Sequence, residues 1–144
     1  MKISDIDAMW EIDCVIDPTE LGVESLKIPR LHFKYQKIYS PERLFLQRLE
    51  TELKTLRLQK KEFYMDGPTQ ETHDAGWKLP PKGRILRVDV QEYIDADQDI
   101  IALSLRIGQQ REKVDKLESI IKSFSNRGFH IRAAIDDMKF KNGF

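Results

Sequence analysis

The feature that most constrains the fold is a run of apolar residues at alternating spacings of three and four. Its members are Ile100, Leu103, Ile107, Gln110, Val114, Leu117, Ile121 and Phe124, with one polar residue among them. This spacing keeps one face of an α-helix apolar over several turns and is typical of helices that pack lengthwise on another helix. It predicts a long helix and a mainly α fold.

A second seam with the same spacing precedes the first. Its positions are Leu46, Leu49, Leu53, Leu56 and Lys60. The segment Asp17-Pro18-Thr19-Glu20 has the residue types of a helix start, and we expect a helical pattern from there to Tyr64. Proline lacks an N–H group and disfavours helix at the residue before it, so Pro29 and Pro41 are two possible interruptions.

The segment Ser40-Pro41-Glu42 resembles a second helix start, which predicts a break or kink near Tyr39. A helix from Pro41 to Tyr64 would be about 36 Å long. Near the N-terminus, Ser4 to Glu11 predicts a short helix with Ser4 as its cap. Asp66 to Gly83 is rich in glycine, proline and threonine and predicts a loop. Within it, Trp77 is either an anchor or an exposed contact.

The region after this loop suggests a small β element. Leu86, Val88 and Val90 alternate with polar residues, which is the period of a half-buried strand. A lone strand needs a partner, so residues 84–92 would pair within the chain or with another subunit. Asp95 to Asp99 then opens the last long helix, and Gly128 suits its end. A short amphipathic helix is expected after Gly128.

The length of 144 residues fits a single domain, 1–144. We divide it into an N-terminal helical part (1–66), a loop and strand (67–94) and C-terminal oligomerisation helices (95–144). Two long seams with little else to cover them favour subunits joined by helices, although one chain could pair its own two seams. The candidate oligomerisation residues are Val114, Leu117, Ile121, Phe124, Phe129, Ile135 and Met138.

The sequence lacks the motifs of several functional classes. The three histidines are spread over the chain and Cys14 stands alone, so no metal-ligand spacing is present. No nucleotide-binding or nucleophile motif occurs, which argues against an enzyme and against a cofactor. A single cysteine suits a reducing compartment, and the start lacks the apolar region of a signal peptide. We therefore expect a soluble intracellular protein that does not enter a membrane.

The strongest candidate for function is an acid-free stretch at the end of the first long helix. Acids and bases balance over the whole chain, with 24 of each, but the only charged residues from Lys54 to Lys61 are cations. The aromatic pair Phe63-Tyr64 follows directly and could offer stacking platforms for bases. Cations are also favoured at a helix C-terminus, so the alternative is that the basic stretch is a solvated helix end without a binding function. The candidate nucleic-acid contacts are Lys54, Arg57, Lys60, Lys61 and Tyr64.

With these features in place, the chain resembles the UvsY family of recombination mediators from T-even-type phages. Four groups of residues carry the resemblance in the same order and at almost the same length. They are Val15-Ile16-Asp17 with Thr19 and Leu21; Leu31, Lys34, Tyr35, Ser40, Arg48 and Glu50; the basic segment with Phe63-Tyr64 and Gly67; and Ala96 to Ile100, Arg127-Gly128-Phe129 and Asp137-Met138. The middle loop matches poorly.

The resemblance implies a protein without enzymatic activity that binds single-stranded DNA in the cytoplasm of the infected host cell. It implies contacts with the phage recombinase and the phage single-strand-binding protein, and a ring of about six or seven subunits that needs the C-terminal region. The family's Leu-Lys-Ala-Arg DNA contact places its arginine on Lys60 but its lysine on Leu58. Arg57 and Lys61 could supply the missing charge.

Two rival classes remain open. A structural coiled-coil adaptor or assembly protein without DNA binding would also show the two seams, and its basic stretch would only be a solvated helix end. A small nuclease would need a carboxylate constellation, and none is placed for it in the sequence.

Overall fold

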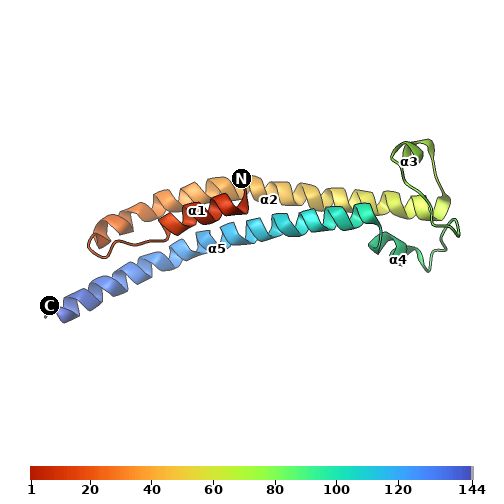
Figure 1. Ribbon diagram of the computed structural model, residues 1–144. Coiled ribbons are helices and arrows are strands. Elements are labelled where there is room, and N and C mark those ends of the chain that lie inside the picture. The colour runs from red at the N-terminus through yellow and green to blue at the C-terminus, as the bar shows by residue number, and fades with distance from the viewer. Residues whose placement is uncertain (144) are drawn as a thin grey trace. The chain divides into compact units, whose positions relative to one another are not determined.

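The computed structural model describes residues 1–143, and its regular elements are α-helices (Figure 1). They are α1 (Ile3–Asp13), α2 (Leu21–Asp66), α3 (Gln70–Asp74), α4 (Val90–Asp95) and α5 (Gln98–Lys141). Phe144, the last residue of the expected C-terminal part, lies outside the described residues. The predicted mainly α fold with two long helices is confirmed.

Tertiary contacts divide the chain into two compact units. Unit 1 consists of residues 1–44 and 111–144, and unit 2 consists of residues 45–110. Each unit contains a part of both long helices, so this division differs from the three consecutive parts that we expected from the sequence.

The core of unit 1 is formed by α1, the first part of α2 and the second part of α5. Its buried members are Ile6, Tyr35, Leu117, Ile120 and Phe124. The Trp10 ring meets those of Tyr35 and Phe124 edge to face, with centroids 5.7 and 5.6 Å apart. In Figure 1, α1 lies alongside the first part of α2. The short helix therefore supplies an aromatic side chain that the two long helices pack around.

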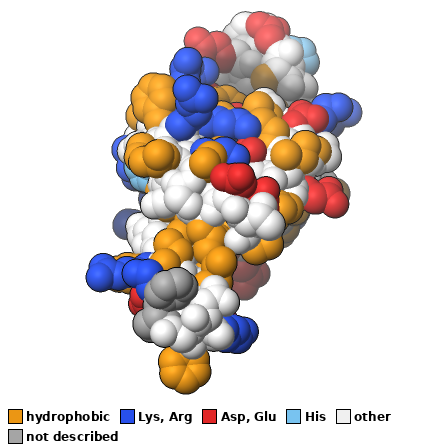
Figure 2. Space-filling model, turned by 90° about the vertical axis from the view of Figure 1, so that its left-hand side faces the viewer, with side chains coloured by type: hydrophobic (Ala, Val, Ile, Leu, Met, Phe, Trp, Pro, Cys, Tyr) orange, Lys and Arg blue, Asp and Glu red, His pale blue; other side chains and the backbone are white. Residues whose placement is uncertain are grey.

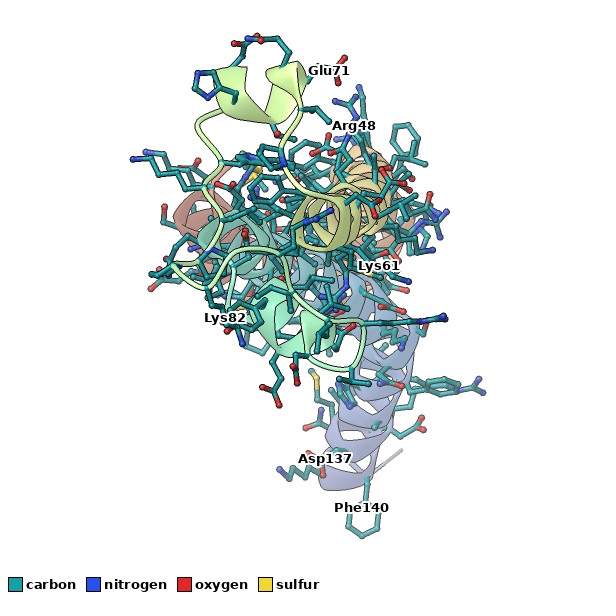
Figure 3. The ribbon with its side chains drawn as sticks, turned by 90° about the vertical axis from the view of Figure 1, so that its right-hand side faces the viewer. Arg48, Lys61, Glu71, Lys82, Asp137 and Phe140 are labelled. Carbon is teal, nitrogen blue, oxygen red and sulfur yellow. The ribbon has the colours of Figure 1, made fainter. Side chains whose placement is uncertain are left out.

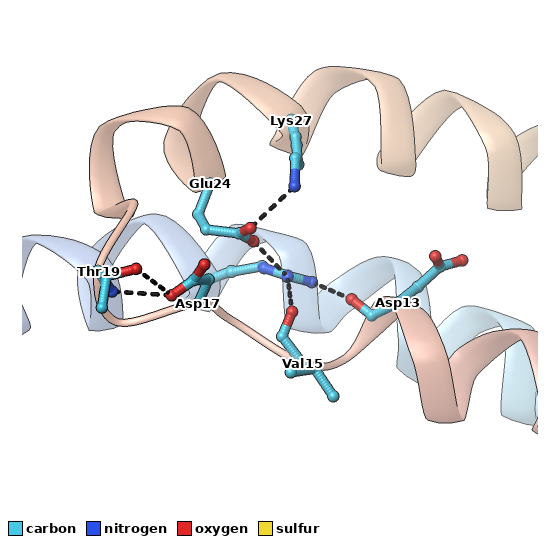
Figure 4. A network of polar contacts seen from close by, with 7 residues as sticks. Asp13, Val15, Asp17, Thr19, Glu24 and Lys27 are labelled. Atoms are coloured by element: carbon cyan, nitrogen blue, oxygen red, sulfur yellow. Dashed lines mark hydrogen bonds and ion pairs between the residues drawn. The ribbon is translucent and has the colours of Figure 1, made fainter.

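A buried arginine ties the connection between α1 and α2 to α5. The Arg127 guanidinium donates to the backbone carbonyls of Asp13 (2.7 Å) and Val15 (3.1 Å), and it pairs with Glu24 at 3.4 Å (Figure 4). Lys27 also donates to Glu24, at 2.9 Å. Because the buried Arg127 side chain needs acceptors for its N–H groups and these two carbonyls supply them, Arg127 stabilises the path of this connection.

The core of unit 2 gathers around the end of α2. Its buried members are Phe63, Tyr64, Ile85, Val90, Ile94 and Ile100, with Leu53, Leu56, Met65, Trp77, Leu79 and Tyr93 packed against them. Trp77 meets Phe63 edge to face with ring centroids 5.5 Å apart. It is therefore an anchor of the long connection rather than an exposed contact. That connection also contains α3, where only a loop was expected.

The predicted β element is absent, since no strand occurs in residues 1–143. Leu86 and Val88, which should have formed the buried face of the strand, are 71% and 86% exposed. The buried residues here are Ile85 and Val90, and Val90 begins α4. The separation of five residues between Ile85 and Val90 suits a turn followed by a helix. The alternation of apolar residues therefore did not indicate which of them are buried.

Neither of the two possible interruptions breaks the first long helix. α2 continues through Pro29 and Pro41, and both prolines are exposed. Each ring leaves one carbonyl, that of Ser25 or Lys37, without its helical donor, but these residues are exposed and water can hydrate them. The burial of Tyr35 between the two prolines holds the helix on its core.

Two helix ends were also placed wrongly. α5 does not stop at Gly128, because Arg127 and Ile131 on either side of it are both buried and keep the helix packed. At the start of α2, the Asp17 carboxylate accepts hydrogen bonds from the backbone N–H and the hydroxyl of Thr19. It therefore caps a turn, and the helix itself begins later, at Leu21.

Candidate nucleic-acid interface

The acid-free stretch lies in unit 2, and Lys60 is its buried member. The Lys60 side chain is only 4% exposed. Its ammonium lies 3.1 Å from a carboxylate oxygen of Asp97 and 2.7 Å from one of Asp99. It also lies 3.7 Å from the centre of the Trp77 ring, which is a cation–π contact. Lys60 thus joins the loop that follows α3 to the start of α5.

Tyr64 belongs to the same cluster. Its hydroxyl donates to Asp97 at 2.6 Å, and the other Asp97 oxygen accepts the backbone N–H groups of Asp99 and Ile100 at 2.9 and 3.2 Å. Asp97 is thus the N-terminal cap of α5. Burial alone would raise the pKa of Asp97, but the hydrogen bonds from Tyr64 and Lys60 outweigh it and lower this pKa. Burial and the bond to Asp97 raise the pKa of Tyr64 well above its usual range.

Arg57 is half exposed and already paired. Its guanidinium donates to Asp95 at 2.9 Å, and the Gln91 amide donates to the same oxygen at 2.8 Å. These hydrogen bonds, that from Arg57 above all, lower the pKa of Asp95. The pair is exposed to solvent and therefore weak, so Arg57 can exchange Asp95 for another anion.

Lys54 and Lys61 are exposed and have no acidic partner within ion-pair distance among residues 1–143. Figure 3 labels Lys61 on α2. The cations of the stretch thus differ in how their charge is neutralised. Lys60 neutralises carboxylates of its own chain, whereas the charged groups of Lys54 and Lys61 are exposed to solvent.

Phe63 and Tyr64, the predicted stacking platforms, do not present free rings in this structure. Both rings are buried, at 3% and 8% exposure, and pack inside unit 2. Lys60, which we expected to contact DNA first, is buried with them. A sequence signal for this was available, because Lys60 occupies a position of the second seam where the other members are leucines. A direct contact of any of these residues with DNA stays a prediction.

The candidate oligomerisation residues fall into two groups. Val114, Leu117 and Phe124 are buried in unit 1, so within this chain they form core and offer no free surface to another subunit. Ile121 and Ile135 are half buried. Phe129 and Met138 are exposed, and the chain presents a further exposed ring nearby in sequence, that of Phe140.

A shallow pocket of about 430 Å³ lies beside the buried cluster, between the end of α2 and α3. Phe63 and Trp77 line it together with the acidic side chains of Glu62, Asp66 and Glu71. These carboxylates repel a phosphate backbone, so this side of unit 2 does not suit nucleic acid. No group of histidine, cysteine or acidic residues in the described part of the chain could hold a metal ion.

Comparison with known proteins decides the family. Residues 9–144 match the sequence profile of the family described as "Recombination, repair and ssDNA binding protein UvsY". The chain belongs to the UvsY family. UvsY proteins act in DNA recombination and repair. No curated protein sequence matches the chain significantly.

Solved structures agree with the UvsY assignment at the level of the fold. A crystal structure of the bacteriophage T4 recombination mediator protein UvsY (lattice type II) superposes with a TM-score of 0.79 at 21% identity, covering 100% of this chain and 99% of that one. Another (lattice type IV) gives a TM-score of 0.77 at 19% identity over 98% and 99% of the two chains. Within residues 1–143, no helix is long and apolar enough to span a membrane.

Proposed function

We propose that this UvsY-family protein is a recombination mediator that binds single-stranded DNA. It promotes loading of the phage recombinase onto DNA covered by the phage single-strand-binding protein, in the cytoplasm of the infected host cell. The observation that carries the proposal is the family match over residues 9–144. The exposed, unpaired lysines of α2 support it.

In this proposal Lys54 and Lys61 contact phosphates directly, and Arg57 contributes by exchanging Asp95 for a phosphate. Lys60 and Tyr64 contribute indirectly, because they hold the start of α5 and the loop with Trp77 against α2. Contacts of this kind neutralise the backbone and do not depend on base sequence. This suits a protein that must act wherever single-stranded DNA is exposed.

Assembly makes such weak contacts useful. Each chain offers few free cations, but a strand that runs over several subunits of a ring engages many copies at once. The exposed side chains Phe129, Met138 and Phe140 near the C-terminus support an assembly through this end of α5. A strand held in this way is drawn from the single-strand-binding protein and presented to the recombinase.

The DNA contact is tested by fluorescence anisotropy with a labelled oligothymidylate at several salt concentrations. Replacing Lys54 and Lys61 together with alanine should weaken binding about tenfold and lower the slope of log affinity against log salt by about 1.4 per subunit engaged. The matched control is Lys122→Ala, because Lys122 is an exposed cation that pairs with Glu118 on its own helix. Equal affinities of the double variant and the wild type would overturn the assignment of these lysines.

The mediator step is tested by adding the protein to recombinase and DNA that is saturated with single-strand-binding protein. The DNA-dependent ATPase of the recombinase should rise with wild-type protein and rise less with the Lys54, Lys61 double variant. A wild-type protein that neither binds the oligonucleotide nor raises this ATPase would instead favour the structural coiled-coil adaptor.

A further inference from the structure

A second acid-free stretch of α2 lies in unit 1. Residues 25–41 contain no Asp or Glu, and they carry four cations, Lys27, Arg30, Lys34 and Lys37. Two of these are neutralised inside the chain, because Lys27 pairs with Glu24 at 2.9 Å and Lys34 pairs with Asp13 at 2.7 Å. Arg30 and Lys37 are exposed and have no acidic partner among residues 1–143.

An exposed aromatic ring stands between these two free cations. Phe33 is 65% exposed, and it follows Arg30 by three residues and precedes Lys37 by four. Residues at these spacings are neighbours on one face of a helix. The core of unit 1 is on the opposite face of α2, where Tyr35 is buried and Leu31 and Ile38 pack against it. The Phe33 ring therefore takes no part in that core.

We propose that Arg30, Phe33 and Lys37 form a second contact site for single-stranded DNA. The Phe33 ring stacks on one base, and the two cations neutralise phosphates on either side of that nucleotide. Arg30 and Lys37 are separated by about 10 Å along the helix axis, so they do not compete for one phosphate. Figure 2 shows Lys and Arg, hydrophobic and acidic side chains mixed on the face turned to the viewer.

Charge argues against a contact of this face with the same face of a second copy. A symmetric contact through this face would place Arg30 and Lys37 beside their own copies, and like charges in contact repel. No carboxylate in residues 25–41 could relieve that repulsion. A polyanion brings the opposite charge, and its bases bring the flat apolar surface that an exposed phenyl ring requires.

The inference rests on the proposed function, since it assumes that the protein binds single-stranded DNA. The test compares an oligothymidylate with an abasic oligonucleotide of the same length, by anisotropy with the full-length protein. Phe33→Leu keeps an apolar side chain but removes the ring, and it should weaken binding of the oligothymidylate about tenfold while leaving the abasic strand unchanged. Phe33→Trp should restore the affinity.

Replacing the two cations should affect DNA binding differently from replacing Phe33. Replacing Arg30 and Lys37 together with alanine should weaken binding of both oligonucleotides and lower the salt slope by about 1.4 per subunit engaged. Lys122→Ala again serves as the control. Because all three side chains are exposed, thermal unfolding should stay unchanged in every variant.

Each other outcome overturns the inference in its own way. If the Phe33 and Arg30, Lys37 variants bind like the wild type while the Lys54, Lys61 variant binds weakly, the second site is wrong and the proposed function stands. If the wild type binds neither oligonucleotide, both fail. If the Phe33 variants sediment as smaller species with unchanged affinity for DNA, this face of α2 is a contact between subunits.

Discussion

The ammonium of Lys60 lies 3.7 Å from the centre of the Trp77 ring, inside unit 2. The same ammonium is within ion-pair distance of Asp97 and Asp99, and the side chain is almost fully buried. One cation thus links α2, the loop that follows α3 and the first turn of α5. This makes the centre of the acid-free stretch a structural element, so the proposed contact with DNA falls to the cations around it.

Lys60→Ala should therefore lower the free energy of unfolding by about 3 kcal/mol, because it leaves the buried Asp97 carboxylate without its cation. The matched control, Lys61→Ala, changes an exposed side chain and should stay within about 0.5 kcal/mol of the wild type. Urea unfolding followed by circular dichroism measures both. Equal midpoints for the two variants would show that the Lys60 ion pairs contribute nothing to stability.

Acid should destabilise unit 2 through Asp97. The pKa of this carboxyl is lower in the folded chain than in the unfolded chain, since Tyr64 and Lys60 donate to its charged form. The stability that it contributes is present above its unfolded pKa of about 4 and is lost as the pH falls through the folded pKa.

The measurement is the unfolding temperature between pH 7 and pH 3. Asp97→Asn removes the titrating group and should flatten this dependence, although Asp13 in unit 1, whose pKa is also lowered, leaves some acid sensitivity. A variant with the full wild-type loss on acidification would contradict this role of Asp97.

A substitution of Leu117 tests whether the apolar seam of α5 packs within the chain or against another subunit. Its side chain is fully buried in unit 1 with Ile6 and Tyr35. Leu117→Ala should cost about 2–5 kcal/mol in the free energy of unfolding at any protein concentration, because it opens a cavity inside the chain. A loss of stability that disappears at high protein concentration would instead indicate that the seam is completed by another subunit.

The exposed aromatic residues near the C-terminus are the better candidates for assembly. Replacing Phe129 and Phe140 together with serine should yield smaller species in analytical ultracentrifugation while the unfolding temperature of the chain changes little. Leu105→Ser is the control, because Leu105 is 65% exposed on α5 in unit 2, away from this end of the chain. Unchanged sedimentation of the Phe129, Phe140 variant would exclude this surface from the assembly.

Several local expectations failed for a shared physical reason. The strand over residues 84–92, the possible interruptions at Pro29 and Pro41 and the stop at Gly128 were all inferred from residues within a few positions. Each was overruled by packing partners distant in sequence. Gly128 continues a helix because Arg127 on one side of it reaches the carbonyls of Asp13 and Val15.

Two long helices follow from the residue pattern alone, because heptad spacing persists over many turns and few other structures satisfy it. The order of particular residues along almost the whole chain also indicates the UvsY family, and the family match over residues 9–144 confirms it. Which charges are free could be learned only from the folded chain. Ion pairing depends on distances between side chains far apart in sequence, so Lys60, with Asp97 and Asp99 beside it, is buried, whereas Lys54, Lys61, Arg30 and Lys37 remain open to solvent.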